Sequence, residues 1–261
     1  MTSPFDPTVT NREHYLVDEV VAEYTASDRL NEPEKQIIAN HADEFRGAVL
    51  DLGVGGGRTS SHLMATASTY VGLDFSPAMV EACRRRYPTG TFVRGDASDL
   101  HTFGDHTFDV VLFSFNGIDT VDHPTRLRIL AEARRVLVPG GLFVFSFHSR
   151  DARGHIKALR LTTRPTLAWA RTQMRNVASW WRVRGGQVET DEYALWSDPE
   201  AGPGCLTYFI TKLDQFDQLI AAGFDEISMY DFNGRPVVVE APDRRSFWFY
   251  VTCRPTSTSS S

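Results

Sequence analysis

The stretch that decides the fold is Ala48-Val49-Leu50-Asp51-Leu52-Gly53-Val54-Gly55-Gly56-Gly57-Arg58-Thr59, an apolar run that passes into a glycine-rich turn. The apolar run predicts a buried strand, and a helical stretch follows from about Arg58 to Thr66. Glycines at alternate positions let the backbone turn sharply, and they let a ligand approach where a Cβ atom would clash. A strand, a glycine turn and a helix in this order are typical of a nucleotide-binding site.

The glycine turn departs from two phosphate-binding patterns. Read from Gly53, it breaks the dinucleotide fingerprint GxGxxG/A, because Arg58 occupies the last glycine or alanine position. No Gly-Lys-Ser/Thr follows, so the turn is not a P-loop either. The sequence therefore predicts a nucleoside site that lacks phosphate recognition.

Two carboxylates follow at the ends of the next predicted strands. Asp74 closes the second strand about 20 residues downstream, where a carboxylate can accept both ribose hydroxyls. Asp96 and Ala97 close the third strand, where a carboxylate and a backbone amide can recognise an adenine edge. Each aspartate taken alone could equally be an ordinary turn former. Together with the glycine turn they predict an adenosine-binding cleft.

Strands and helices alternate through the first half of the chain. We predict further strands at 69–74, 91–96, 108–115 and 142–147, helices at 76–87 and 123–137, and a turn at Pro139-Gly140-Gly141. Such alternation favours an α/β fold with a doubly wound, mostly parallel sheet. Strands predicted at 224–231 and 246–254 bring the sheet to seven.

Five motifs in order across residues 49–148 resemble those of class I S-adenosylmethionine-dependent methyltransferases. They are Asp51–Gly57, Gly72–Met79, Gly95–Ala97, Phe108–Val111 and Arg135–Gly141. The one departure is Val54, where many members carry a small residue or cysteine. The resemblance implies a Rossmann-like methyltransferase fold, a transferase activity and S-adenosyl-L-methionine (SAM) as cofactor.

The resemblance also implies a role for each residue near the methionine end of SAM. Gly53 and Gly55 would pack against the methionine portion, and Asp51 would orient its amino group. Phe113 and Ser114, at the end of the fourth strand, would line the same end of the site.

Toward the nucleoside the resemblance implies a second group of contacts. Asp74 would hold the ribose hydroxyls, with Phe75 and Met79 against the adenine. Asp96 and Ala97 would recognise the adenine edge.

The chain divides into five predicted parts. They are an N-terminal helical lid (1–47), a cofactor-binding core (48–150), an inserted acceptor-binding lobe (151–205), a C-terminal completion of the sheet (206–254) and a disordered tail (255–261).

Within the lid we predict one helix, from about Glu13 to Tyr24. In some small-molecule members of the family, an aromatic residue and an arginine before the first strand touch the methionine carboxylate. Tyr24 and Arg29 match that pair loosely, and surface packing is the alternative. Within the lobe we predict a helix over 155–181, broken at Pro165, and a strand over 187–196.

The candidate catalytic base is His148, at the end of the fifth strand on the ligand edge. A histidine titrates near neutral pH and could take a proton from a hydroxyl acceptor. The alternative is a hydrogen-bonded structural histidine. His155 and Asp119 are weaker candidates for the same role.

The inserted lobe combines aromatic and basic residues, from which we predict the acceptor-binding set Trp180, Trp181, Arg182, Tyr193 and Tyr208. Tryptophan stacks on sugar rings and arginine grips carboxylates, so this lobe favours an anionic or sugar-like small acceptor. A dimer-forming aromatic face, and hence a homodimer, is the alternative.

In its length and in this lobe, the chain is similar to mycobacterial sugar-acid methyltransferases such as the one acting on glucosylglycerate. That similarity predicts O-methylation of a hydroxylated sugar acid, with N-methylation of a small amine as the alternative.

Other functions are disfavoured by composition and by missing motifs. The net charge of −6 argues against a nucleic-acid partner, and Ser114-Phe115-Asn116-Gly117 stands where nucleic-acid methyltransferases carry Asn/Asp-Pro-Pro-Tyr/Phe. A noncatalytic cofactor-binding subunit remains as an alternative outside the enzymes.

No apolar run reaches the roughly 18–20 residues that cross a bilayer, and no signal sequence opens the chain, so we expect a cytoplasmic protein without a membrane partner.

We expect no metal site. Cys83, Cys205 and Cys253 form no CxxC pair, and Asp119, Asp122 and Asp231 could meet Mg²⁺ but have no ligand spacing.

Overall fold

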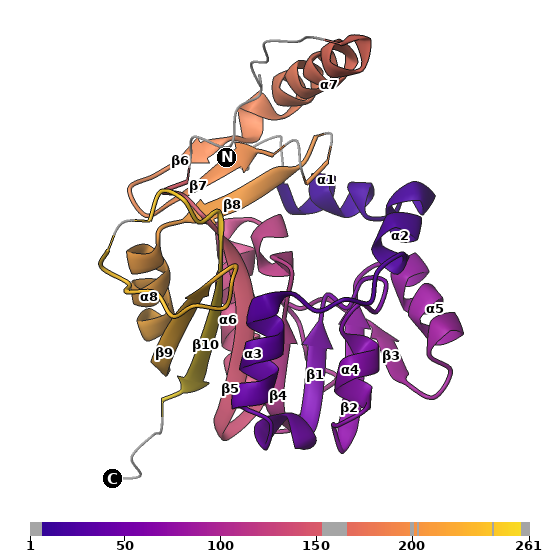
Figure 1. Ribbon diagram of the computed structural model, residues 1–261, viewed down its shortest axis with the longest axis vertical. Helices are drawn as coiled ribbons and strands as arrows, with labels where there is room; N and C mark the ends of the chain where they lie inside the picture. The colour runs from indigo at the N-terminus through magenta and orange to yellow at the C-terminus, as the bar shows by residue number, and fades with distance from the viewer. Residues whose placement is uncertain (1–6, 153–165, 199–200, 203, 242, 257–261) are drawn as a thin grey trace.

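The computed structural model describes residues 7–152, 166–198, 201–202, 204–241 and 243–256. Its centre is a sheet with helices on both faces, as the α/β prediction requires (Figure 1). Seven core strands lie in the order β3 (Thr91–Arg94), β2 (Thr69–Asp74), β1 (Ala48–Leu52), β4 (Phe108–Phe113), β5 (Leu137–Ser149), β10 (Trp248–Pro255) and β9 (Phe224–Asp231).

The first five of these strands pair in parallel, whereas β10 runs antiparallel between β5 and β9. Because the strands β1 to β5 are parallel, their carboxyl ends meet at one edge, which is where ligands bind in open α/β sheets. The predicted turn at Pro139–Gly141 falls inside β5 as a bulge: Phe108 pairs with Leu137, but Val110 already pairs with Leu142.

Alternate side chains of each core strand point to opposite faces. Val49 packs with α3 (Glu32–Asn40), α4 (Ser60–Met64) and α5 (Pro77–Arg86) on one face. Leu50 packs with α6 (His123–Val136) and α8 (Lys212–Ala221) on the other. The helix predicted from residue 76 begins with a cap: Ser76 Oγ accepts from the Met79 N–H, and Pro77 takes the first helical position of α5.

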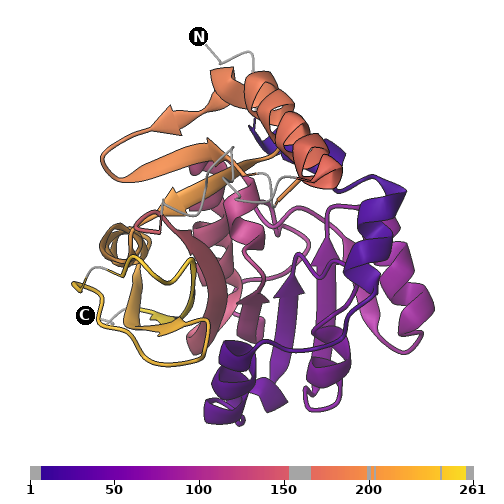
Figure 2. The ribbon, with the colours of Figure 1, turned by 45° about the horizontal axis from the view of Figure 1, so that its top comes forward.

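A second group of strands extends the sheet beyond the carboxyl end of β5. β8 (Leu206–Ile210) pairs with His148 and Ser149 of β5 and, over its whole length, with β7 (Tyr193–Ser197). β6 (Val188–Glu189) completes this antiparallel extension, so the strand predicted over 187–196 is a hairpin of two short strands. The helix α7 (Leu167–Val183) lies above the hairpin (Figures 1 and 2). The predicted helical residues 155–165 are outside the described residues.

The N-terminal segment differs from the single helix that was predicted over 13–24. It forms α1 (Pro7–His14) and α2 (Asp18–Thr25), followed by α3. α3 begins with a capping box that the sequence analysis missed: Asn31 and Glu34 satisfy each other's backbone N–H groups. In the described part of the chain, no helix combines the length and apolar character needed to cross a bilayer.

At the C-terminal end, ordered structure continues past the predicted boundary at residue 255. Pro255 is the last residue of β10, and Thr256 donates its N–H to Gly223 O at 2.9 Å.

A fully buried ion pair ties α6 to the loop after β4. The Arg126 guanidinium bonds to Asp119, to the Ile118 carbonyl at 3.1 Å and to Gln218 at 3.0 Å, and both charged side chains are 0% exposed. Asp119 belongs to the 3-10 helix η2 (Gly117–Thr120), so this pair holds η2 against α6. Removing one partner of a buried pair leaves an uncompensated charge, which costs more than the pair itself contributes.

We therefore expect Arg126→Ala to lower the free energy of unfolding by about 3–5 kcal/mol, measured by urea denaturation. The double variant Arg126→Ala/Asp119→Asn removes the stranded charge and recovers part of that loss. A single variant that unfolds at the wild-type midpoint would show that the pair does not hold η2.

Candidate active site

One cavity lies at the carboxyl edge of the parallel strands, and it encloses about 850 Å³ of empty space including its open mouth. Ten of the twelve residues predicted to bind the cofactor line it: Tyr24, Gly53, Gly55, Asp74, Phe75, Met79, Asp96, Ala97, Phe113 and Ser114. The sheet therefore brings together residues that are far apart in the sequence, as parallel pairing demands.

Asp74 is fixed at the end of β2 by two backbone hydrogen bonds. Its Oδ2 accepts from Gly55 N–H at 2.8 Å, and its Oδ1 accepts from Ser76 N–H at 2.9 Å. Burial raises the pKa of this carboxyl, and the two backbone bonds act against that rise. Asp74 thus joins the glycine turn to the end of β2 while it lines the cavity.

The glycine turn fits closely under the N-terminal segment. Gly55 has a φ of +54°, a conformation that side chains other than glycine rarely adopt. A Cβ on Gly56 would lie 2.3 Å from the Tyr24 carbonyl oxygen, so the α2 backbone can rest on the turn only if this residue is glycine.

The N-terminal helices cover the side of the cavity that lies at the ends of β2 and β3. Arg12 and Tyr15 line the cavity beside Tyr24, and neither was predicted from the sequence. The Tyr15 ring meets Tyr24 and Phe75 edge to face, with centroids 5.9 and 6.3 Å apart. Arg12 lies over the Phe75 ring at 5.4 Å.

Arg12 also forms an ion pair with Asp96, at the end of β3. Burial alone would raise the pKa of Asp96, but hydrogen bonds from Ser98 and Arg12 outweigh it and lower the pKa. Among the described residues that line the cavity, Arg12 is the one lysine or arginine, and its charge is already paired.

Two predicted cofactor residues do not line the cavity. Asp51 lies beneath the glycine turn, where its Oδ2 accepts from Thr59 Oγ1 at 2.6 Å and from Tyr70 OH at 2.9 Å. Arg29 is exposed; its backbone N–H donates to Ser27 Oγ at 3.4 Å, and its carbonyl accepts from Arg58 at 3.0 Å. Neither residue lines the cavity, and the contacts of Asp51 and Arg29 with a cofactor stay predictions.

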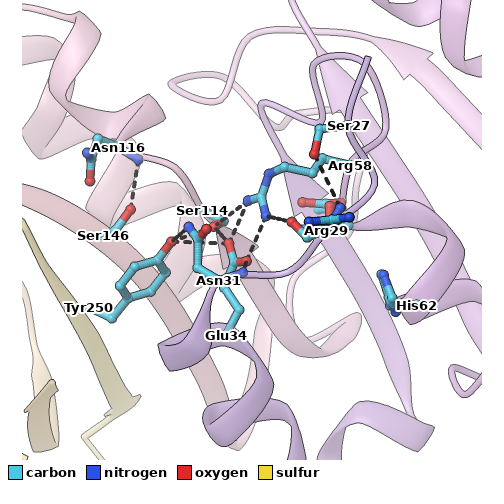
Figure 3. Close-up of polar contacts among 12 residues, drawn as sticks. Ser27, Arg29, Asn31, Glu34, Arg58, His62, Ser114, Asn116, Ser146 and Tyr250 are labelled. Atoms are coloured by element: carbon cyan, nitrogen blue, oxygen red, sulfur yellow. Dashed lines mark hydrogen bonds and ion pairs between the residues drawn. The ribbon is translucent and has the colours of Figure 1, made fainter. Parts of the chain in front are cut away.

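A polar network holds the other end of the cavity, around Ser114 (Figure 3). Arg58 and Glu34 form a two-point ion pair at 2.7 and 2.6 Å, and Ser114 Oγ donates to Glu34. Tyr250 OH donates to the same Glu34 oxygen at 3.1 Å, and Asn31 donates to Tyr250 OH at 2.9 Å. The network fixes Ser114 at the cavity wall. Arg58, the residue that departs from the dinucleotide fingerprint, thus connects the glycine turn to Glu34 of α3.

His148 does not line the cavity, and its role as a catalytic base stays a prediction. Asp119 accepts from His148 Nδ1 at 2.8 Å, and Asn116 Nδ2 lies 3.3 Å from His148 Nε2. The ring is 5.3 Å from Phe209 and 5.5 Å from Trp248, centroid to centroid. These contacts match the alternative that we raised, a hydrogen-bonded structural histidine, and His155 lies outside the described residues.

The predicted acceptor residues lie away from the cavity as well. Tyr208 is 0% exposed, and its OH is 2.7 Å from His123 Nδ1. Tyr193 stacks on both Tyr208 and His123, at 4.9 and 4.3 Å. The two tyrosine rings thus pack against each other and on His123 of α6, and their contact with an acceptor stays a prediction.

The remaining acceptor candidates lie on α7. Trp180 and Trp181 are 36% and 54% exposed, and neither they nor Arg182 line the cavity. The Arg184 guanidinium covers the Trp181 ring at 3.9 Å.

The three aspartates considered for Mg²⁺ all serve the protein itself. Asp119 bonds to His148 and Arg126, Asp122 caps α6, and Asp231 accepts backbone N–H groups. Within the described ranges, no three His, Cys, Asp or Glu side chains gather as metal ligands.

Comparison with known proteins matches the part of the chain that forms much of this cavity. A family model described as a methyltransferase domain matches residues 49–141, which include the glycine turn, Asp74 and Asp96. Residues 49–141 are therefore similar to a methyltransferase domain. The stretch ends in the bulge of β5, so the domain accounts for the floor of the cavity and not for its cover.

Two curated relatives match this domain and little beyond it. The chain is 41% identical over 102 residues to a phthiotriol/phenolphthiotriol dimycocerosates methyltransferase of Mycobacterium tuberculosis, with 38% of this chain and 36% of that protein aligned. It is 39% identical over 134 residues to a fatty-acid O-methyltransferase of Mycolicibacterium smegmatis, with 49% of this chain and 46% of that protein aligned. The chain thus spans less than half the length of these relatives.

A solved structure shares the fold over nearly the whole chain. It is the CcbJ methyltransferase from Streptomyces caelestis, with a TM-score of 0.61 and 20% identity, covering 93% of this chain and 98% of the other. The Rossmann-like methyltransferase fold predicted from the sequence is therefore confirmed.

The burial of Asp51 makes the stability of the domain depend on pH. Burial raises the pKa of Asp51 from 3.8 to about 6, against the hydrogen bonds from Thr59 and Tyr70. The folded state therefore binds this proton more tightly than the unfolded state does. The contribution of Asp51 to the free energy of unfolding falls by about 3 kcal/mol as the pH rises from about 4 to about 6, and it is level above that.

Asp51→Asn removes this titration. We expect the free energy of unfolding of the wild type, minus that of Asp51→Asn, to decrease between pH 4 and pH 7 in urea titrations at each pH. A difference that increased with pH would contradict the account.

Proposed function

We propose that the whole chain is a SAM-dependent methyltransferase that acts on a small-molecule acceptor. The observation that carries the proposal is the charge pattern of the cavity: the buried carboxylate of Asp74 and the partly exposed carboxylate of Asp96 line it, and its one described lysine or arginine is paired. Such a lining suits a nucleoside joined to an amino acid and does not suit a pyrophosphate, which needs free N–H donors or cations.

The residues present fit the cofactor that the fold implies. Asp74 would hold the ribose hydroxyls, and Asp96 with Ala97 would hold the adenine edge. Gly53, with no side chain, leaves room at the methionine end. When bound, SAM supplies a methyl group on a sulfonium, whose in-line displacement depends mainly on alignment of donor and acceptor. Tyr15 and Tyr24 then serve to exclude water from the covered side.

For the acceptor we propose a molecule with an apolar part. The Phe115 ring lines the cavity and is 41% exposed, and it meets Trp248 edge to face at 5.0 Å. Phe232, 47% exposed, meets the same tryptophan at 5.6 Å. These rings come from three separate segments and leave apolar surface beside the cavity mouth, which favours an apolar ligand. The names of the two relatives, which refer to a fatty acid and to dimycocerosates, agree with such an acceptor.

O-methylation of a sugar acid is the second candidate. Its support is the exposed Trp180, Trp181 and Arg182 of α7, the residue types that bind sugars and carboxylates.

One experiment distinguishes the apolar acceptor from the sugar acid: a cell extract is incubated with the protein and isotopically labelled SAM, and the products are identified by mass spectrometry. We expect label in apolar, organic-extractable products. Label confined to water-soluble sugar acids favours the second candidate, and label on nitrogen favours N-methylation. If the protein binds SAM but no product is labelled, the chain is a noncatalytic binder.

Asp74→Ala tests the cofactor site. We expect the affinity for S-adenosylhomocysteine, measured by calorimetry, to fall about 10- to 150-fold, because a hydrogen bond to a charged group contributes about 1.5–3 kcal/mol. Asp217→Ala, which removes an exposed carboxylate from α8, is the control and should bind as the wild type does. Equal affinity for the wild type and Asp74→Ala would refute this placement of the ribose.

Phe232→Ala tests the acceptor surface. With the labelled acceptor from the extract as substrate, we expect its KM to rise about fivefold, because burying part of an aromatic ring contributes about 1 kcal/mol. The Kd for S-adenosylhomocysteine should not change. Leu213→Ala is the matched control, since Leu213 is 48% exposed on α8. A KM that rises equally in both variants would rule out a specific role for Phe232.

A further inference from the structure

Asn11, on the N-terminal helix α1, is 2% exposed and makes three hydrogen bonds to distant parts of the chain. Its Nδ2 donates to Thr120 O at 2.7 Å and to Leu206 O at 2.6 Å, and its Oδ1 accepts from Leu206 N–H at 3.0 Å. Both amide hydrogens and the amide oxygen are therefore used. With Leu206 the side chain forms a two-way pair, as a neighbouring strand would.

The two partners of Asn11, Thr120 and Leu206, and its chain neighbour Arg12 belong to different parts of the molecule. Thr120 ends η2 and lines the cavity. Leu206 begins β8, whose other end pairs with β5 through Phe209 and Ile210. On α1 itself, the next residue is Arg12, which pairs with Asp96 across the cavity. The Asn11 side chain thus joins the α1 cover, the cavity wall at η2 and the strand extension at β8.

Two further contacts hold α1 in the same place. Thr8 Oγ1 accepts from Asp122 N–H at 3.2 Å, next to the start of α6. A Cβ on Gly202 would lie 2.4 Å from His14 Nε2, so the chain that leads into β8 packs directly on α1. A cover that only needed to shield the cofactor would not require a buried link to β8.

We propose that Asn11 is a positioning residue that couples the α1 cover to the β6–β8 extension, so that closing over the cofactor and placing the extension are one event. The inference rests on the proposed function, because it takes the cavity to be the cofactor site. If the two are coupled, linkage requires that ligand in the cavity protects β8, and that loosening β8 weakens the hold of the cover on the ligand.

The test combines two measurements on Asn11→Ala, which removes all three bonds without adding charge. The first is the dissociation rate of S-adenosylhomocysteine, followed by stopped flow. The second is amide hydrogen exchange in peptides covering 7–14 and 204–210. We expect dissociation about tenfold faster, faster exchange in both peptides without ligand, and loss of the ligand-induced protection of 204–210 that the wild type shows.

Asn11→Asp should have a larger effect than Asn11→Ala, because its carboxylate would face the carbonyl oxygens of Thr120 and Leu206. Asn11→Ser is a second variant, and it should have a smaller effect on dissociation and exchange than Asn11→Ala. Cys253→Ala is the control: Cys253 is buried on β10 opposite Phe143, toward the far end of β5, so it should lower the melting temperature without changing dissociation.

Faster exchange in 7–14 alone, with an unchanged dissociation rate, would overturn the coupling and leave Asn11 a local anchor of α1. If the wild type bound no S-adenosylhomocysteine, the proposed function would fail instead. The exchange of the two peptides without ligand would still report whether Asn11 links them.

Discussion

The carboxylate of Asp74 accepts one backbone N–H from the glycine turn after β1 and another from the start of α5, and the site depends on this bridge. It requires β1 and β2 to be parallel neighbours, so that the end of one strand meets the turn that follows the other. It also requires Gly55 to adopt a positive φ, which points its N–H at the carboxylate. Asp96 and Ser114 then reach the same cavity from the ends of β3 and β4.

Around that bridge, two buried charge networks connect the elements that close the cavity. The Arg58–Glu34 pair joins the glycine turn to α3 and Ser114, and the Arg126–Asp119 pair joins η2 to α6 and His148. Each network lets a loop at the carboxyl edge keep one conformation, because a buried charge must stay paired. The cavity wall is thus held by ionic contacts behind it and remains available to a ligand in front.

The strands and helices of the core could be predicted from the sequence because the signals that specify them are local. A glycine turn, a strand-ending aspartate and a Ser-Pro helix start each identify themselves within a few residues, and parallel pairing brings them together. Arg12 and Tyr15 carry no such local signal, since their place over the cavity depends on contacts with Asp96 and Phe75, far along the chain. The sequence does not show that Tyr193 and Tyr208 stack on His123, because this stacking is a long-range contact. In the same way, a strand-end position does not reveal that Asp119 holds the His148 ring.

The structure of the protein in complex with S-adenosylhomocysteine tests the central claim most directly. The account predicts the ribose hydroxyls on Asp74, the adenine near Phe75 and Asp96 with the Arg12 pair opened or shifted, and the homocysteine beside Gly53 and Ser114. A ligand bound elsewhere, or a cavity that instead holds a dinucleotide with its pyrophosphate on the glycine turn, would contradict it.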